Sequence, residues 1–344
     1  MIEKIVYSEY EKNWLVDVPV KTNIWIRPEC QRRQFEVIKK ARPSILFLSS
    51  DGGRNEKEWE AIRLNRKMFD TEIDWNCTVY KIYMDSNNGL YEIARIRKDT
   101  IWDNVDRCIF LEDDQLPAVS FFEFCKQLLE KYENDNRVGV ICGYNILGIY
   151  EKPNSDYFFT NKGSIWGYAT WRSVSQTRKK DFEFYNDSYT MSLLKEQTKN
   201  DKTCWKRINK LGNKGTYNGH VAGGEFWNDF DVYAEHRLQI VPSQNMISNI
   251  GCTADATNAD SLDQMPRAVR KMFDSATHEI TFPMKHPLCI IPDHEYAQKR
   301  NRILAYGHPL VRKYRMFVRG IKKLLKGDIN YIFNKIEYKK NKKS

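Results

Sequence analysis

One short stretch constrains this chain more than any other. Its apolar run Cys108–Leu111 stops at three successive carboxylates, Glu112, Asp113 and Asp114. A short apolar run between polar residues is typical of a buried strand in a parallel sheet, and open α/β sheets bind ligands beyond the carboxyl ends of such strands. Three adjacent carboxylates repel one another unless a positive group lies between them. Because Mg²⁺ and Mn²⁺ bridge carboxylates to phosphates, the stretch predicts a metal–diphosphate site. The alternative is a solvated acidic turn.

Units of the same kind surround this stretch. The pattern predicts strands at residues 18–26, 44–49, 77–84, 108–111 and 138–142, and helices at 30–40, 55–68, 91–105 and 121–132. Alternating strands and helices indicate an α/β fold, in which a mostly parallel sheet has helices on both faces.

The composition agrees with a folded protein in a reducing compartment. Of the 344 residues, 41% are hydrophobic and 13% aromatic, which supports a sizeable core. No stretch approaches the roughly 20 apolar residues of a membrane-spanning helix, and the first residues contain no secretory segment. The eight cysteines include no Cys-x-x-Cys pair, so we expect buried thiols in the cytoplasm rather than a zinc site or disulfides.

The net charge of +10 comes from the C-terminal end. From Lys299 onward, 15 Lys and Arg residues face two acids, a net +13 that leaves about −3 for the rest of the chain. Apolar residues recur there at helical spacing: Val311, Tyr314, Phe317, Val318, Ile321, Leu324 and Leu325. Such a basic amphipathic helix predicts contact with an anionic membrane surface, and the alternative is a helix packed on the body. Because no recognition motif accompanies the charge, we expect no nucleic-acid partner.

Glycines alternate with aromatic residues in "KGSIWGYATWR", which contains Gly163, Trp166 and Gly167. Glycine lets the backbone approach a ligand closely, and aromatic rings stack on the C–H faces of sugars. The segment therefore predicts a sugar-binding loop, and the alternative is an aromatic core strand.

A second group of acids lies among aromatic residues near position 225. Glu225 follows two glycines, and Asp229 comes one helical turn later. Burial beside aromatic rings raises a carboxylate pKa towards the range of a general base, whereas a surface role is the alternative.

Several of these motifs resemble one enzyme family. The "LEDD" stretch resembles the Asp-x-Asp-type (DXD) metal motif of nucleotide-sugar-dependent glycosyltransferases with the GT-A fold, in the form found in relatives of N-acetylglucosaminyltransferase I and in bacterial polysaccharide loci. "IWIRPECQRRQ" is similar to the family's strand-to-Arg-Pro turn, "FLSSDGGRN" to its "SDGPR", "SIWGYATWR" to "SIWGWATWR", and "IVPSQNMISNIG" to "IVPNVNLVSNIG". The resemblance covers roughly residues 18–290.

The resemblance implies a role for each matching residue. Nucleotide-sugar binding falls to Arg27, Pro28, Ser50, Asp51, Glu112, Asp113, Gly163, Trp166 and Gly167. Asp51 suits the base or ribose, because a carboxylate accepts N–H and O–H donors. Asp114 is implied as the most direct metal ligand, with Asp113 beside it. Glu225 matches the family's catalytic acid, and Asp229 is the reserve candidate.

The chain departs from the family in "SNIGCTADATNA", where the family has "SNIGFGEDATHT". Asn258 stands in place of the family's histidine, and Asn is a weaker metal or phosphate ligand. Either the metal rests on the acidic motif and the diphosphate alone, or His286 in "FPMKHP" replaces the ligand. The alternative for His286 is a packed or surface side chain.

These expectations define an enzyme of the GT-A fold. Residues 1–295 would form the catalytic domain, with a nucleotide-sugar half at 18–145 and an acceptor half at 146–295, and residues 296–344 would form the basic amphipathic tail. It would be a Mn²⁺- or Mg²⁺-dependent, inverting glycosyltransferase. It would move a sugar from a nucleotide diphosphate, UDP first among the candidates, to a glycan or lipid-linked precursor of a bacterial capsule, lipopolysaccharide or exopolysaccharide, at the inner face of the cell membrane.

Two other functions stay open at this stage. A nucleotidyltransferase that makes nucleotide sugars would need a Gly-rich phosphate loop after the first strand, and "IRPECQRRQ" contains no glycine. A non-catalytic basic protein that binds membranes or RNA, with a decayed site, would explain Asn258.

Overall fold

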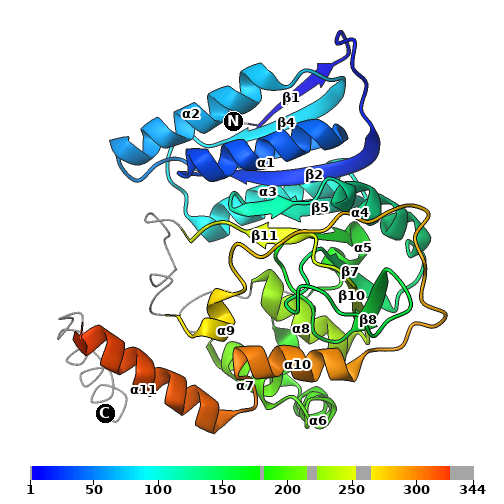
Figure 1. The fold of residues 1–344 in the computed structure, drawn as a ribbon, viewed down its shortest axis with the longest axis vertical. Coiled ribbons are helices and arrows are strands. Elements are labelled where there is room, and N and C mark those ends of the chain that lie inside the picture. Colours follow the sequence, from blue (N-terminus) through cyan, green and yellow to red (C-terminus); the bar gives the residue numbers. More distant parts are fainter. Residues whose placement is uncertain (1, 179–181, 215–222, 253–264, 326–344) are drawn as a thin grey trace.

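The computed structural model describes residues 2–178, 182–214, 223–252 and 265–325 (Figure 1). Asn258 and the end of the tail, residues 326–344, lie outside the described residues. The main sheet of the described chain has nine strands in the order β1-β4-β3-β2-β5-β9-β7-β10-β8. Their bounds are β1 Ile2–Tyr7, β2 Val16–Ile24, β3 Pro43–Ser50, β4 Cys77–Tyr83, β5 Arg107–Leu111, β7 Val138–Cys142, β8 Tyr157–Thr160, β9 Tyr168–Trp171 and β10 Leu238–Pro242.

Most of these strands run in one direction. β2 pairs in parallel with β3 and β5, β3 with β4, and β7 with β10. β9 inserts antiparallel between β5 and β7, and β1 and β8 are antiparallel at the two edges. The predicted parallel α/β sheet is confirmed, although the pattern did not predict β1 or the reversed strand β9.

Helices cover both faces of the sheet, as predicted. α1 (Pro28–Ala41), α2 (Glu56–Glu72) and α4 (Ser120–Lys131) pack into the large core on one face. α3 (Leu90–Asn104) lies on the other, where Trp102 packs with Phe47 and Tyr80. Phe35, Ile38 and Phe69 are fully buried, and burying a side chain of this size stabilises the fold by about 1.5–3 kcal/mol.

Helix α1 begins where it does for a local reason. Pro28 occupies the first helical turn, where its fixed φ suits a helix and its missing N–H costs no hydrogen bond. The helix therefore starts a few residues after β2 ends at Ile24. This places Arg27, the residue before the helix, at the carboxyl edge of the sheet.

A small second sheet covers the end of β5. β6 (Gln115–Pro117) pairs antiparallel with β11 (Ile247–Asn249), which joins segments more than 100 residues apart in the chain. The Ile250 amide also donates to the Asp114 carbonyl at 2.8 Å. This pairing brings the chain after β11 over the acidic turn.

The second half adds a helical layer beyond the sheet. Its remaining helices are α5 Arg172–Gln176, a 3₁₀ turn at Glu183–Asn186, α6 Ser188–Gln197, α7 Lys202–Lys214, α8 Gly224–Ala234, α9 Arg267–Arg270 and α10 His294–Leu304. Phe226, Trp227 and Phe230 of α8 pack with Leu194 of α6 and Ile208 of α7 in a separate core. This core holds α8 against α6 and α7.

The basic helix of the tail is present as α11, Pro309–Leu325 (Figure 1). Leu310, Tyr314 and Phe317 are 78%, 68% and 66% exposed, so these apolar side chains do not pack on the described body. The packed alternative is therefore wrong for these residues. In the described chain, no helix combines the length and apolar character that crossing a bilayer requires.

Candidate active site

The acidic turn follows β5 at the carboxyl edge of the parallel strands. The Gln115 amide donates to the Glu112 carbonyl at 3.1 Å and closes the turn. Glu112 is exposed, but Asp113 is only 6% exposed and Asp114 is mostly buried. A solvated turn is therefore the wrong description for the two aspartates.

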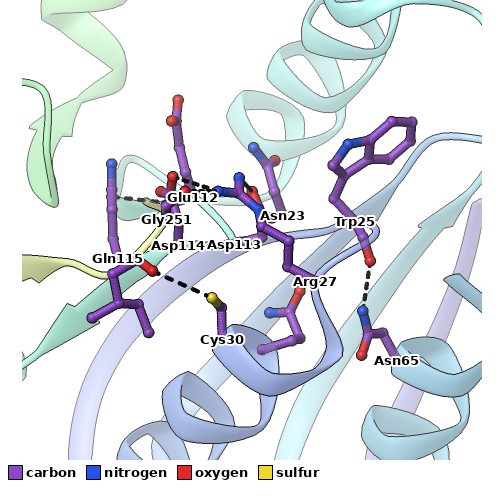
Figure 2. A network of polar contacts seen from close by, with 12 residues as sticks. Asn23, Trp25, Arg27, Cys30, Asn65, Glu112, Asp113, Asp114, Gln115 and Gly251 are labelled. Atoms are coloured by element: carbon purple, nitrogen blue, oxygen red, sulfur yellow. Dashed lines mark hydrogen bonds and ion pairs between the residues drawn. The ribbon is translucent and has the colours of Figure 1, made fainter. Parts of the chain in front are cut away.

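The chain itself supplies a positive group between these carboxylates. Arg27 Nε and one terminal nitrogen donate to the two oxygens of Asp113 at 2.9 and 3.1 Å, and its other terminal nitrogen donates to Asp114 at 3.0 Å (Figure 2). That nitrogen also reaches the Gly251 carbonyl at 3.3 Å. The Arg27 guanidinium thus binds two neighbouring carboxylates at once.

Burial sets the electrostatics of this group. Burial raises the pKa of Asp113 to about 6, the charges of Asp114 and Glu112 act in the same direction, and Arg27 opposes them. Burial also disfavours the charge on Arg27, but its two aspartate partners outweigh that and raise its pKa. One guanidinium faces two carboxylates, so the cluster retains negative charge.

The residues fit a divalent metal, with fewer protein ligands than the three acids suggest. Among the described residues, Asp114 Oδ1 is buried without a hydrogen-bond partner, whereas both oxygens of Asp113 are engaged by Arg27. Within the described ranges, no three or more His, Cys, Asp or Glu side chains gather in a metal-holding group. Because Mg²⁺ is often held by one or two carboxylates together with substrate phosphates, Asp114 with a diphosphate is a chemically reasonable ligand set.

His286 is not brought to this turn. Its Nδ1 lies 3.0 Å from the Tyr157 hydroxyl, and burial together with Lys131 lowers its pKa. Lys131 is the last residue of α4, and the acidic turn precedes the first residue of this helix. A 12-residue helix is about 18 Å long, so its length separates the neighbourhood of His286 from the turn. His286 is exposed, so the surface alternative describes it in this structure.

Of the predicted nucleotide residues, Ser50 ends β3 and Asp51 follows it, and both are buried. The Asp51 carboxylate accepts the backbone N–H groups of Gly52, Asn88 and Gly89, each at 2.9 Å. Ser50 Oγ accepts from Arg66 at 2.9 Å. Asp51 therefore ties the loop after β3 to the loop after β4, and its oxygens are already occupied by protein donors.

The glycines near residue 165 are required for packing. A Cβ on Gly163 would lie 2.4 Å from Gln239 Oε1, and a Cβ on Gly167, which has φ +60°, would lie 2.4 Å from Ile247 Cδ1. Trp166 is half-buried between the rings of Tyr144 and Phe273. The end of this segment is a sheet strand, β9, as the core-strand alternative had it.

Two buried glutamines that sequence reasoning missed hold the acidic turn. The Nε2 atom of Gln34 donates to the carbonyls of Glu112 and Gln115 at 2.6 Å each. Gln115 Oε1 accepts the amides of Glu112 and Gly167 at 3.0 and 2.8 Å. Helical spacing could have predicted that Gln34 is buried, because Gln31 and Gln34 share a helix face with Phe35 and Ile38.

Two cations on the other face of the sheet were also missed. Lys21 in β2 is buried and donates to the Leu111 carbonyl at 3.0 Å, and Arg97 in α3 donates to Asn23 at 2.7 Å. Burial and the neighbouring Arg97 hold the pKa of Lys21 well below its ordinary value, and Glu112 opposes this. The sequence did contain an indication of this buried cation, because Lys21 lies within the apolar strand predicted at 18–26. The acidic turn is thus flanked by cations on both sides.

The two acids of α8 lie in different environments. Asp229 accepts from Lys162 and Arg207, each at 2.9 Å, and Lys162 also pairs with Asp201 at 2.6 Å. Glu225, in the first turn of α8, has a side chain that is 52% exposed, with Arg207 3.6 Å away. Asp229 belongs to a mostly buried ion network. Glu225 is exposed to solvent, so the expected burial beside aromatic rings is wrong for this residue and the surface alternative describes it.

Tyr168 links this helix to the acidic turn. Its ring stacks on Phe110, two residues before Glu112, with 5.1 Å between ring centroids. A Cβ placed on Gly224 would lie 3.8 Å from the Tyr168 hydroxyl oxygen. The start of α8 and the end of β5 therefore flank one tyrosine.

Comparison with known proteins identifies no family for this chain. No family model and no curated protein matches this chain. Among 114 matching chains of solved structures is a mannosyltransferase from Pyrobaculum calidifontis in complex with GDP-Man and Mn²⁺, which is 12% identical with a TM-score of 0.33. The match covers 49% of this chain and 50% of that one. Similarity at this level identifies neither a family nor an activity.

Proposed function

We propose that this chain is a nucleotide-sugar-dependent glycosyltransferase. The observation that carries the proposal is the pairing of Asp113 and Asp114 with Arg27 at the carboxyl edge of the parallel strands. Such a site offers carboxylate oxygens for a divalent cation and a guanidinium for phosphate, the two groups that a nucleotide diphosphate needs. The resemblance of the surrounding motifs to GT-A enzymes supports the same conclusion.

Within this proposal, Asp114 holds the metal through its unpartnered oxygen, and Asp113 orients Arg27. A bound Mn²⁺ or Mg²⁺ would neutralise charge on the departing diphosphate. Arg27 binds the same diphosphate from the protein side, and Arg97 of α3 adds positive potential behind Glu112.

The proposed base is Glu225, and the reaction inverts the anomeric carbon. The acceptor oxygen forms the new bond to the sugar, the bond to the diphosphate breaks, and the acceptor proton passes to Glu225. Asp229 supports this helix through its ion pairs with Lys162 and Arg207. Glu225 is the better candidate of the two because its carboxylate is accessible to an acceptor, whereas the carboxylate of Asp229 is held by Lys162 and Arg207.

A thermal-shift panel tests this function. UDP-, GDP- and CDP-sugars are added with and without Mn²⁺, and a ligand at 100 times its Kd stabilises the folded state by about 2.7 kcal/mol. We expect one donor class to raise the Tm only with metal, UDP-sugars first, and to release nucleoside diphosphate in an acceptor-dependent way. Release of inorganic pyrophosphate would instead indicate a nucleotidyltransferase, and no shift with any donor would contradict the proposal.

We propose further that the acceptor is a lipid-linked precursor of a bacterial surface glycan and that α11 holds the enzyme at an anionic membrane. Leu310, Tyr314 and Phe317 are exposed on a helix that also carries five Lys and Arg residues between 312 and 322. Each basic residue near an anionic surface contributes about 1 kcal/mol.

Vesicle sedimentation tests the membrane proposal. We expect the chain to bind phosphatidylglycerol vesicles but not phosphatidylcholine vesicles, and the triple variant Leu310→Ser, Tyr314→Ser, Phe317→Ser to lose binding without losing stability. Equal binding to both kinds of vesicle, or an unaffected triple variant, would contradict it.

A further inference from the structure

The three contacts that Arg27 makes with the aspartates are unequal. Asp113 is held by two nitrogens, one on each oxygen, at 2.9 and 3.1 Å, which is the bidentate geometry that fixes a guanidinium most firmly. Asp114 is held by one nitrogen through Oδ2, and within the part of the chain that the structure describes its Oδ1 has no partner. Asp113 is therefore the anchor of Arg27, and the contact to Asp114 is the one that can be exchanged.

The backbone closes this site on one side. A Cβ on Gly251 would lie 2.2 Å from Asp114 Oδ2 and 2.4 Å from the Arg27 nitrogen that binds it. A side chain at this position would displace Asp114 or Arg27, so Gly251 lies directly against the exchangeable ion pair (Figure 2). The same nitrogen faces the Gly251 carbonyl at 3.3 Å. Arg27 thus has a second acceptor beside Asp114.

The charges at this site disfavour the binding of a divalent cation alone and the binding of a diphosphate alone. A divalent cation at Asp114 meets the Arg27 guanidinium within a few ångströms, in a largely buried site where charges are weakly screened. A diphosphate alone meets Asp113 and Asp114, two carboxylates that share the single guanidinium of Arg27. When both ligands are present, the diphosphate attracts Arg27 and the cation attracts Asp114, so each ligand relieves the repulsion of the other.

We propose that Arg27 is an exchangeable counter-ion that makes the binding of a divalent cation and of a nucleoside diphosphate interdependent. It stays bidentate on Asp113 and exchanges its Asp114 contact for diphosphate oxygens. This rests on the proposed function, because it assumes that both ligands use this site. The consequence is that free Mn²⁺ binds poorly, although two buried aspartates are present.

Titration calorimetry and the EPR signal of free Mn²⁺ test this without any turnover. Mn²⁺, UDP and GDP are titrated singly and in pairs into the full chain. For the unaltered chain we expect weak binding of Mn²⁺ alone and a mutual enhancement within the roughly 5–150-fold range of typical coupling. Arg27→Gln removes the charge, so Mn²⁺ alone should bind about tenfold more tightly, and the enhancement should fall towards one.

Two further variants control for folding and for charge. Arg32→Gln, on the same helix and ion-paired with Glu36 and Glu72, should leave both affinities unchanged. Arg27→Lys keeps the charge and should leave Mn²⁺ binding weak, which separates charge from shape.

The outcomes distinguish this inference from the proposed function. Strong coupling that survives in Arg27→Gln would overturn the role of Arg27 and leave the glycosyltransferase proposal standing. Failure of the unaltered chain to bind Mn²⁺ with either nucleotide would overturn both.

Discussion

Replacing Gln34 by leucine should strongly destabilise the fold around the acidic turn. Gln34 is fully buried, and its amide nitrogen donates to the Glu112 and Gln115 carbonyls at 2.6 Å each. Its oxygen accepts from Thr22 and Gln31 at 2.6 and 3.0 Å. Leucine preserves the volume approximately but leaves four polar groups without this partner.

The magnitude follows from these lost partners. An unsatisfied buried polar group costs about 1–3 kcal/mol, and some of the four groups will find water or new partners, so we expect a loss of roughly 3–5 kcal/mol in the free energy of unfolding. That is a large share of the roughly 5–15 kcal/mol that stabilises a typical domain. The change should also weaken nucleotide binding, because the carbonyls of the acidic turn lose their anchor.

Urea denaturation followed by tryptophan fluorescence measures the effect. Gln127→Leu is the matched control, because this half-buried glutamine of α4 donates only to Glu123 one turn earlier, at 2.7 Å. We expect the control to change stability by less than about 1 kcal/mol. If Gln34→Leu were no more destabilised than Gln127→Leu, the reasoning on the amide network would be refuted.

Three other predictions concern the site and the tail. Asp114→Ala should abolish the Mn²⁺ dependence of nucleotide binding measured by calorimetry while leaving the circular dichroism spectrum intact; an unchanged dependence would remove Asp114 as the ligand. Glu225→Gln should lower turnover about 10²–10⁴-fold with donor affinity preserved, whereas Asp229→Asn should mainly lower the Tm; the reverse pattern would move the base to Asp229. Deleting residues 309–344 should change the Tm little, because Leu310 and its apolar neighbours are exposed; aggregation or unfolding of the truncated chain would show that the helix packs on the body.

The sequence predicted the elements that have a strong local pattern. The strands β2 to β5 and β7 and the helices α1 to α4 all lie within a few residues of their expected positions. β9 was missed as a reversed strand because "YATW" has the residues of a buried strand but carries no information on direction. β1 was missed because its side chains are mostly exposed and show no clear alternation.

The site was predicted in part for a similar reason. The acidic turn and its place at a strand end follow from a local pattern. The Arg27 contacts join residues 86 and 87 positions apart, and those of Gln34 span 78 and 81 positions, so only the sheet topology brings them together. We expected the positive group between the carboxylates to be a metal ion, and in the structure Arg27 occupies that role. His286 was a wrong candidate for the same reason, because the sequence around a single histidine does not indicate how far it lies from the site.

A crystal structure of the chain with UDP or GDP and Mn²⁺ tests the central claim most directly. The account predicts an anomalous manganese peak about 2.1 Å from an oxygen of Asp114 and bridged to the diphosphate, with Arg27 still bidentate on Asp113 and in contact with a phosphate oxygen. A nucleotide bound elsewhere, or an acidic turn with Arg27 still on both aspartates and no manganese at saturating ligand, would contradict it.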